Sequence, residues 1–152
     1  MSLYLEFDEL VRCLGDGSVR FAVAGGLAVG LHGYVRATED IDLLVAAADL
    51  DRAGSVLHGL GYRENPDPQV FPKSGLTLHR FYKGLPAQQD LLVVDLLIPQ
   101  SDSMEQILAR AVKIGYGNGS IRVVSAPDLI AMKRLRNSKA DQADIDYLER
   151  NR

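Results

Sequence analysis

Residues 25–45 read GGLAVGLHGYVRATEDIDLLV. A glycine pair opens this stretch, the acids Glu39, Asp40 and Asp42 fall within four positions, and the apolar run 43–45 closes it. In a strand, side chains at i and i+2 point to the same face, so Asp40 and Asp42 are expected to project together. Two carboxylates about 4 Å apart repel by roughly 4 kcal/mol at an effective dielectric near 20. A basic side chain, a shared proton or a divalent cation must therefore offset their charge.

A third acid occurs in the most apolar part of the chain. Asp95 lies within LLVVDLLIP, where an isolated buried charge is costly. If this segment pairs beside 41–45, Asp95 joins Asp40 and Asp42 in one cluster, whose oxygen ligands suit Mg²⁺ or Mn²⁺. The alternative is that Asp95 forms a salt bridge with an arginine or faces solvent at a sheet edge. The same-face pair at Asp40 and Asp42 favours the cluster.

Composition and length narrow the class of protein. The chain has 152 residues, 47% of them hydrophobic and 24% charged, which predicts one globular domain over 1–152. The net charge of −3 argues against binding nucleic acid over the whole surface. Cys13 is the only cysteine, the N-terminus lacks the pattern of a signal peptide, and no apolar run is long enough for a membrane span. We therefore expect a soluble, cytoplasmic protein without a membrane partner.

Hydrophobic spacing predicts an α+β fold with a mixed sheet and helices packed on it. The helices are expected at 3–14, 27–31, 49–60, 103–112, 127–138 and 140–148, and the strands at 21–24, 41–45, 76–82 and 90–98. The strands at 76–82 and 90–98 are expected to pair antiparallel, and Asn118-Gly119 to turn a hairpin. Asp49 and either Ser101 or Ser103 are expected to cap helices.

Other polar residues permit two interpretations each. The basic stretch of Lys133, Arg134, Arg136 and Lys139 is either a solvated helix face or, at Lys133, a triphosphate contact. Among the histidines, His58 is expected at the surface. His32 is expected in packing or solvent rather than at a nucleotide, and a position facing the cleft is the less favoured alternative for His79. The acids Asp141, Asp144 and Asp146 are expected to form caps and surface pairs. No histidine and cysteine set has zinc spacing, and no Ser/His/Asp set stands out.

These motifs resemble the DNA polymerase beta-like nucleotidyltransferase superfamily. The likeness rests on a strand followed by Gly25-Gly26, a short helix, R-x-T-x-D-I-D from Arg36, and the lone strand residue Asp95. The ending PDLIAMKRLRNSKADQADIDYL is similar to the C-terminal helices of small bacterial, abortive-infection toxin-like members. The resemblance spans roughly 20–150 and implies the nucleotidyltransferase fold.

The resemblance also implies roles for individual residues. Asp40, Asp42 and Asp95 would ligate metal ions, Mg²⁺ or Mn²⁺, and Asp95 would also assist deprotonation of the attacking hydroxyl. Gly25 and Gly26 would bind the β- and γ-phosphates of a nucleoside triphosphate (NTP). Arg36, Thr38 and Lys133 would contact nucleotide or phosphate less directly. The implied reaction transfers a nucleoside monophosphate (NMP) from the NTP to a hydroxyl of a small molecule, protein or RNA, and expels pyrophosphate.

One departure from the family pattern leaves a second function open. Most members have Gly-Ser where this chain has Gly25-Gly26, although Gly-Gly forms occur among toxin-like relatives. The alternative to an active enzyme is a degenerate nucleotide-binding or toxin–antitoxin module, and a third is a structural protein whose acids pair with Arg36 and Lys133. The short chain implies that a second copy or a partner protein supplies the acceptor site.

Overall fold

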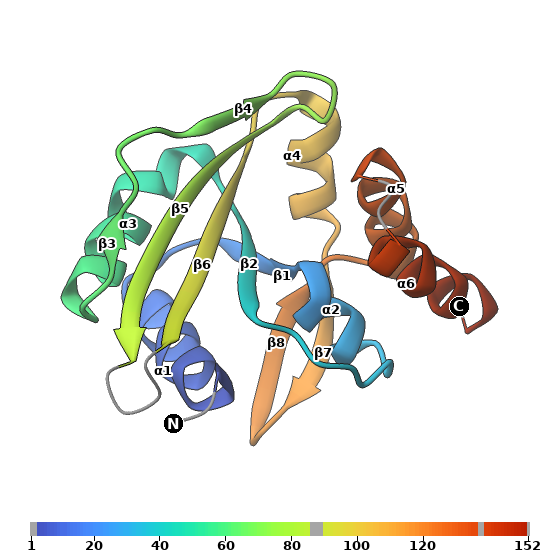
Figure 1. Cartoon of the computed structure of the whole chain (residues 1–152), viewed down its shortest axis with the longest axis horizontal. Helices are drawn as coiled ribbons and strands as arrows, with labels where there is room; N and C mark the ends of the chain where they lie inside the picture. The colour runs from blue at the N-terminus through green and yellow to red at the C-terminus, as the bar shows by residue number, and fades with distance from the viewer. Residues whose placement is uncertain (1–2, 86–89, 137–138, 152) are drawn as a thin grey trace.

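The structure is a computed structural model that describes residues 3–85, 90–136 and 139–151. Its helices are α1 Leu3–Asp16, α2 Gly25–Leu31, the 3₁₀ turn η1 Ala47–Asp49, α3 Leu50–Gly59, α4 Asp102–Ala109, α5 Ala126–Arg136 and α6 Lys139–Arg150. Its strands are β1 Phe21–Ala24, β2 Asp40–Val45, β3 Arg63–Glu64, β4 Gln69–Phe71, β5 Leu76–Leu85, β6 Asp90–Pro99, β7 Val112–Tyr116 and β8 Gly119–Val123. The predicted α+β class is confirmed (Figure 1).

All eight strands belong to one mixed sheet. Its order is β3-β5-β6-β2-β1-β8-β7, and β4 pairs with residues 76–78 at the start of β5. The pairs β2–β6 and β1–β8 are parallel, whereas the other pairs are antiparallel. The expected β5–β6 pair and the hairpin between β7 and β8 are both present. Strands β2 and β6 therefore lie side by side in the middle of the sheet.

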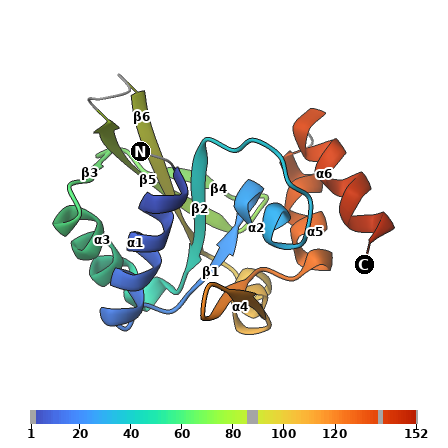
Figure 2. The same ribbon diagram turned by 90° about the horizontal axis from the view of Figure 1, so that it is seen from below.

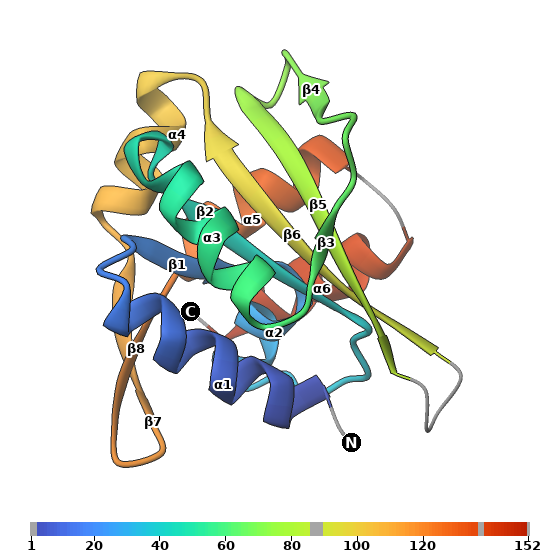
Figure 3. The ribbon, with the colours of Figure 1, turned by 90° about the vertical axis from the view of Figure 1, so that its left-hand side faces the viewer.

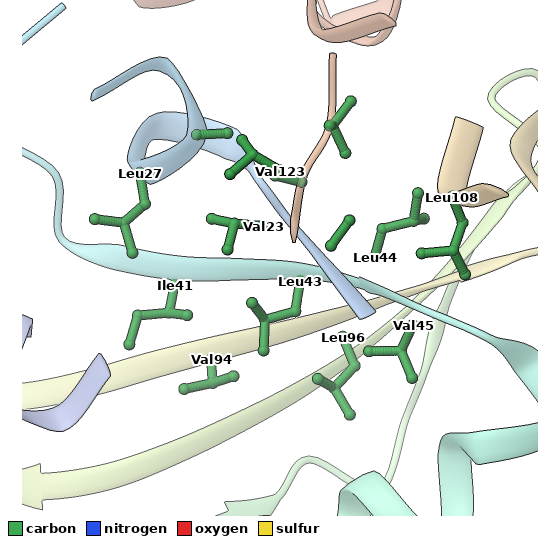
Figure 4. Close-up of a cluster of buried hydrophobic side chains, with 14 of the residues drawn as sticks. Val23, Leu27, Ile41, Leu43, Leu44, Val45, Val94, Leu96, Leu108 and Val123 are labelled. Atoms are coloured by element: carbon green, nitrogen blue, oxygen red, sulfur yellow. The ribbon is translucent and has the colours of Figure 1, made fainter. Parts of the chain in front are cut away.

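The two faces of β2 and β6 are distinguished by alternation. Ile41 and Leu43 of β2 and Val94 and Leu96 of β6 are fully buried on one face, beneath α1 and α3 (Figures 3 and 4). Helix α1 contributes apolar residues at helical spacing, such as Phe7, because a 3.6-residue period aligns them on one side. The opposite face carries the acids, and α5 and α6 lie on that side of the sheet (Figure 2).

Local details differ from the expectations. The helix expected over 103–112 ends at Ala109, and Val112 begins β7. Positions 137 and 138 of the expected helix 127–138 lie outside the described residues. The glycine pair lies inside α2, which starts at Gly25 rather than at Leu27. Asp49 does not cap α3 with its side chain, because its carboxylate accepts the backbone N–H of Arg20 at 2.9 Å. Ser101 is the expected cap of α4 and accepts the backbone N–H of Met104. Within the described ranges, no helix has both the length and the apolar character needed to cross a membrane.

Candidate active site

Four neighbouring strands bring polar groups into one row. The register pairs Arg80 of β5 with Asp95 of β6, Asp95 with Asp42 of β2, and Asp42 with Ala24 of β1. Because partners across a ladder share a face, these side chains are neighbours on the side opposite Ile41. The position immediately after Ala24 is Gly25, so the row ends at the glycine pair. The structure thus brings Asp95 and Asp42 together as the sequence suggested.

Asp40 and Asp42 emerge on the open face of β2. Both side chains are half-buried, while Ile41 between them is fully buried. The alternation expected from the sequence is therefore present. Within the part of the chain that the structure describes, no group of three or more His, Cys, Asp or Glu side chains is arranged to hold a metal ion. Asp95 is engaged by Arg80.

Asp95 is held by an arginine that sequence reasoning did not single out. Arg80 Nε and Nη2 donate to the two oxygens of Asp95, each at 2.9 Å. Asp95 is 3% exposed, whereas the Arg80 side chain is 43% exposed. The hydrogen bond to Asp95 is the main reason that the pKa of Arg80 is raised, and the charges of Asp40 and Asp42 add to it. From the sequence, a salt bridge with an arginine and a place beside Asp42 were alternatives for Asp95. In the structure Asp95 has both.

The glycine pair is required by the side chains next to it. A Cβ at Gly25 would lie 2.0 Å from Oδ2 of Asp42, and the φ of Gly25 is +62°, which favours glycine. A Cβ at Gly26 would lie 2.8 Å from Thr38 Oγ1 and 3.1 Å from Arg36 Nη2. The Asp42 carboxylate and the Thr38 hydroxyl thus pack directly on the backbone at the start of α2. Thr38 also donates to the backbone oxygen of Asp40, at 3.4 Å.

A second charged cluster borders the same site. Arg36 donates to both oxygens of Asp144 at 2.7 Å, and Lys133 Nζ lies 2.9 Å from Asp144 and 3.5 Å from Asp141. Asp144 is completely buried, and Lys133 and Asp141 are nearly so. The ring stack of Tyr34 on Tyr147, with centroids 4.8 Å apart, adds a second contact between the segment before β2 and α6.

The surface role expected for Asp141 and Asp144 is wrong. Both lie on the inner side of α6 with Ile145 and Leu148, whereas Asp146 is exposed as expected. The inward face follows a helical period, so the acids enter the core together with apolar neighbours and need cations there.

Lys133 is likewise not part of a solvated basic face. Arg134 is exposed and pairs with Glu149. The side chains of Arg136 and Lys139 lie outside the described residues.

The pKa values of the second cluster reflect competition between burial and pairing. Burial alone would raise the pKa of Asp144, but hydrogen bonds from Arg36 and Lys133 outweigh it, so the net shift is downward from 3.8. The hydrogen bond to Asp144 raises the pKa of Arg36 in turn. Asp144 and Arg36 are therefore both charged at neutral pH.

The histidines take no part in the row of acids. His79 lies on the opposite face of β5 from Arg80 and approaches Glu64 at 3.6 Å, so the cleft position considered for it is wrong. His32 Nε2 is within hydrogen-bonding distance of the backbone oxygen of Val124, at 2.9 Å. His58 is exposed, as expected, with its ring edge-on to Phe81.

A cavity of about 620 Å³ joins both clusters. Its polar part is lined by Gly25, Gly26, Arg36, Thr38, Asp40, Asp42, Arg80, Asp95, Lys133 and Asp141, which include every residue that the sequence singled out as a site candidate. Its other part is apolar and includes Phe71, Leu78, Leu97 and Met132, which the sequence analysis did not single out. This size and mixed lining are typical of small-molecule sites.

Comparison with solved structures identifies the fold. ANT(2")-Ia in complex with adenylyl-2"-tobramycin is 14% identical, with 95% of this chain and 85% of that chain covered and a TM-score of 0.63. The lincosamide antibiotic adenylyltransferase LnuA, lincomycin-bound, is 17% identical, with 95% and 94% covered and a TM-score of 0.62. A Thermotoga maritima protein classed as a nucleotidyltransferase is 12% identical, with 97% and 93% covered and a TM-score of 0.64. The chain has the nucleotidyltransferase fold. No family model and no curated protein matches its sequence, so the likeness concerns the fold.

Proposed function

We propose that this protein is a metal-dependent nucleotidyltransferase that transfers NMP from an NTP to a hydroxyl of an acceptor molecule. The observation that carries the proposal is the row Arg80–Asp95–Asp42 ending at Gly25, set in a cavity on a nucleotidyltransferase fold. Fold alone does not determine function, so the argument rests on this arrangement of side chains. The cytoplasm is the proposed location, in keeping with a single cysteine.

The donor set fits a hard divalent cation, Mg²⁺ or Mn²⁺. Asp40 and Asp42 offer carboxylate oxygens on one face of β2, and Asp95 adds a third once Arg80 releases it. Carboxylates without histidine or cysteine are the ligands that such ions prefer. When bound, the ion neutralises phosphate charge and polarises the oxygens that react. Arg80 supplies positive charge to the same three acids in the structure, which supports the idea of a cation site.

The surrounding residues then have separate tasks. Gly25 and Gly26 line the cavity at the start of α2, and because they lack a Cβ the Asp42 carboxylate and the Thr38 hydroxyl lie directly against the backbone that would bind phosphate. The Thr38 hydroxyl lies next to Gly26 and supplies the hydroxyl group that the glycine pair lacks. Arg36 and Lys133 are engaged by Asp144, so they act through the shape and charge of the cavity wall.

The reaction balances without a further reactant. The acceptor oxygen forms a bond to the α-phosphorus, the bond from that phosphorus to the bridging oxygen breaks, and pyrophosphate leaves. The hydroxyl proton passes to an oxygen of Asp95, which is buried beside the attacking position. Catalysis consists mainly of alignment and charge neutralisation, as expected for phosphoryl-group chemistry.

The test is Mg²⁺-dependent pyrophosphate release from each NTP with a panel of hydroxyl acceptors. Asp42→Asn should reduce the rate by about 10³-fold, because it removes charge from the cation site. Asp90→Asn is the matched control, since Asp90 is exposed at the far end of β6 and should leave the rate unchanged. Equal rates in Asp42→Asn and the unmodified protein would refute the mechanism.

The alternative is a nucleotide-binding or toxin–antitoxin module without turnover. The pairing of both Asp95 oxygens with Arg80 favours it, because an enzyme must break that pair while a binding module need not. Titration calorimetry with NTP and Mg²⁺ separates the two. Nucleotide binding that depends on Asp42 but releases no pyrophosphate with any acceptor identifies the module.

A further inference from the structure

One end of the cavity is apolar, and its position relative to the acids has a consequence for the acceptor. Leu78 of β5 and Leu97 of β6 are register partners. They lie two residues along each strand from the Arg80–Asp95 pair and therefore on the same face of the sheet. Both are half-buried and line the cavity. Met132 of α5 and Phe71 of β4 also belong to the apolar wall, and Phe71 is 42% exposed.

The wall lies on the Asp95 side of the site. Across the sheet, the order is Leu78 and Arg80 on β5, then Leu97 and Asp95 on β6, then Asp42 on β2, and finally Gly25 after β1. Leu78 is therefore separated from the glycines by both acidic strands, and Leu97 is separated from them by β2. Phosphate bound at Gly25 and apolar groups bound at Leu78 would lie on opposite sides of Asp42 and Asp95.

In-line displacement places the acceptor opposite the leaving pyrophosphate. This step rests on the proposed function, which puts pyrophosphate at the glycine end and the attacking oxygen at Asp95. The acceptor body then extends beyond Asp95, where Leu78, Leu97, Met132 and Phe71 line the cavity. Apolar surface that leaves water against such a wall favours binding.

The apolar end of the cavity disfavours a polycation. Leu78, Leu97, Met132 and Phe71 offer no carboxylate, and Arg80, the charged residue two positions from Leu78, is itself a cation. A molecule with several ammonium groups would have to place them against an apolar surface.

We propose that the acceptor is a hydroxyl compound with an apolar face and little or no positive charge, seated against Leu78, Leu97, Met132 and Phe71. The hydroxyl end points to Asp95, and the apolar part lies along the wall toward β4. The acceptor class is thereby distinguished from polycationic amino sugars and from charged polymers such as RNA.

Matched probes test the class directly. Octyl glucoside and methyl glucoside carry the same sugar hydroxyls and differ in the apolar tail, and kanamycin is a polycationic polyol. Calorimetry with each probe, in the presence of Mg²⁺ and a non-hydrolysable NTP, should show octyl glucoside binding at least tenfold more tightly than methyl glucoside. Kanamycin should bind more weakly than octyl glucoside. Equal binding of the two glucosides, or a preference for kanamycin, would overturn the proposal.

Two substitutions on β4 locate the binding. Phe71→Ala should weaken octyl glucoside about tenfold, because Phe71 lines the cavity, and should leave NTP affinity unchanged. Val70→Ala is the control, since Val70 is 66% exposed on the same strand and is not among the residues that line the cavity. Octyl glucoside binding that is equally strong in Phe71→Ala reflects detergent on the surface and overturns the proposal.

The outcomes also separate this inference from the proposed function. If Phe71→Ala weakens NTP instead of octyl glucoside, the wall holds the nucleobase and the acceptor class is wrong, while nucleotidyl transfer stands. If octyl glucoside binds in a Phe71-dependent manner but no NTP binds, the apolar ligand site stands and nucleotidyl transfer fails. The same variants serve for a search among hydroxyl compounds once turnover is measured.

Discussion

Two groups of acids meet at one cavity and are neutralised differently. Asp144 is completely buried between Arg36 at 2.7 Å and Lys133 at 2.9 Å, so one carboxylate has two cations. Asp95 is paired with Arg80, whose side chain is 43% exposed and whose charge also acts on Asp40 and Asp42. In the helix cluster, which consists of Arg36, Lys133, Asp141 and Asp144, two cations neutralise two buried acids within the protein. In the strand cluster of Asp40, Asp42 and Asp95, Arg80 is accessible and its charge acts on all three acids, and such a cation can be exchanged.

This difference assigns the clusters to different tasks. Breaking a buried pair leaves an uncompensated charge, which is strongly destabilising, so the Asp144 cluster fixes α6 and α5 to the segment before β2. The Arg80–Asp95 pair is at the cavity surface, where water and ions screen it, so its loss costs less. Substitutions in the helix cluster should therefore mainly lower the free energy of unfolding. Substitutions in the strand cluster should mainly change how Mg²⁺ affects the free energy of unfolding.

The largest expected effect is at Asp144. Asp144→Asn should lower the free energy of unfolding by about 3–5 kcal/mol, because Arg36 and Lys133 lose their shared anion in a buried place. Asp146→Asn is the control on the same helix, since Asp146 is exposed and accepts a hydrogen bond from Gln142 at the surface. Urea unfolding measures both. A change below about 1 kcal/mol at Asp144 would remove the distinction between the clusters.

The strand cluster could be predicted from the sequence because its geometry is local. Asp40 and Asp42 share a face by the two-residue period alone, and the apolar context of Asp95 marks it as unusual. Its register beside Asp42 was a conditional expectation, since parallel pairing of β2 and β6 depends on chain that is distant in sequence. Arg80 was not singled out for the same reason.

The helix cluster was misread although a signal was present. Asp141, Asp144, Ile145 and Leu148 follow spacing of three, four and seven residues, which places the two acids on the buried side of α6. Acids on an apolar face require cations, and Lys133 on the preceding helix was available. What the sequence could not show is that Arg36, more than a hundred residues away, completes the pair.

A smaller effect is expected where the clusters are linked, at Gly26. Gly26→Ser should lower the free energy of unfolding by about 1–2 kcal/mol, because its Cβ would lie 2.8 Å from Thr38 Oγ1 and 3.1 Å from Arg36 Nη2. Thr38→Ala in the same protein should relieve most of this loss, which a double-mutant cycle in urea measures. Gly30→Ser is the control in α2, where nothing lies within 4 Å. Additive effects of Gly26→Ser and Thr38→Ala would contradict the crowding.

The response to Mg²⁺ tests whether Arg80 is exchangeable. Arg80→Ala should lower the free energy of unfolding by about 1 kcal/mol without metal. Mg²⁺ should then stabilise the variant more than it stabilises the unmodified protein, because the ion no longer competes with Arg80. Arg110→Ala is the control, since Arg110 makes an equivalent two-pronged pair with Asp128 that does not line the cavity. If Mg²⁺ has the same effect on both variants, Arg80 does not stand in for a cation.

The smallest expected effect is in the dependence of stability on pH. The pKa of Asp144 is lower in the folded protein than its ordinary 3.8, because the hydrogen bonds from Arg36 and Lys133 outweigh burial, so the folded state binds this proton less readily than the unfolded chain. Its contribution to stability is therefore complete above about pH 5 and is lost as the pH falls through 4 and below, by at most about 1.4 kcal/mol per pH unit. Asp144→Asn should reduce the loss of unfolding free energy at low pH, as measured by urea unfolding at several pH values. Asp128, whose pKa is lowered chiefly by Arg110, should behave likewise in Asp128→Asn. If the free energy of unfolding of Asp144→Asn falls as steeply at low pH as that of the unmodified protein, Asp144 already pairs in the unfolded chain. The helix cluster would then contribute less to folding than its burial indicates.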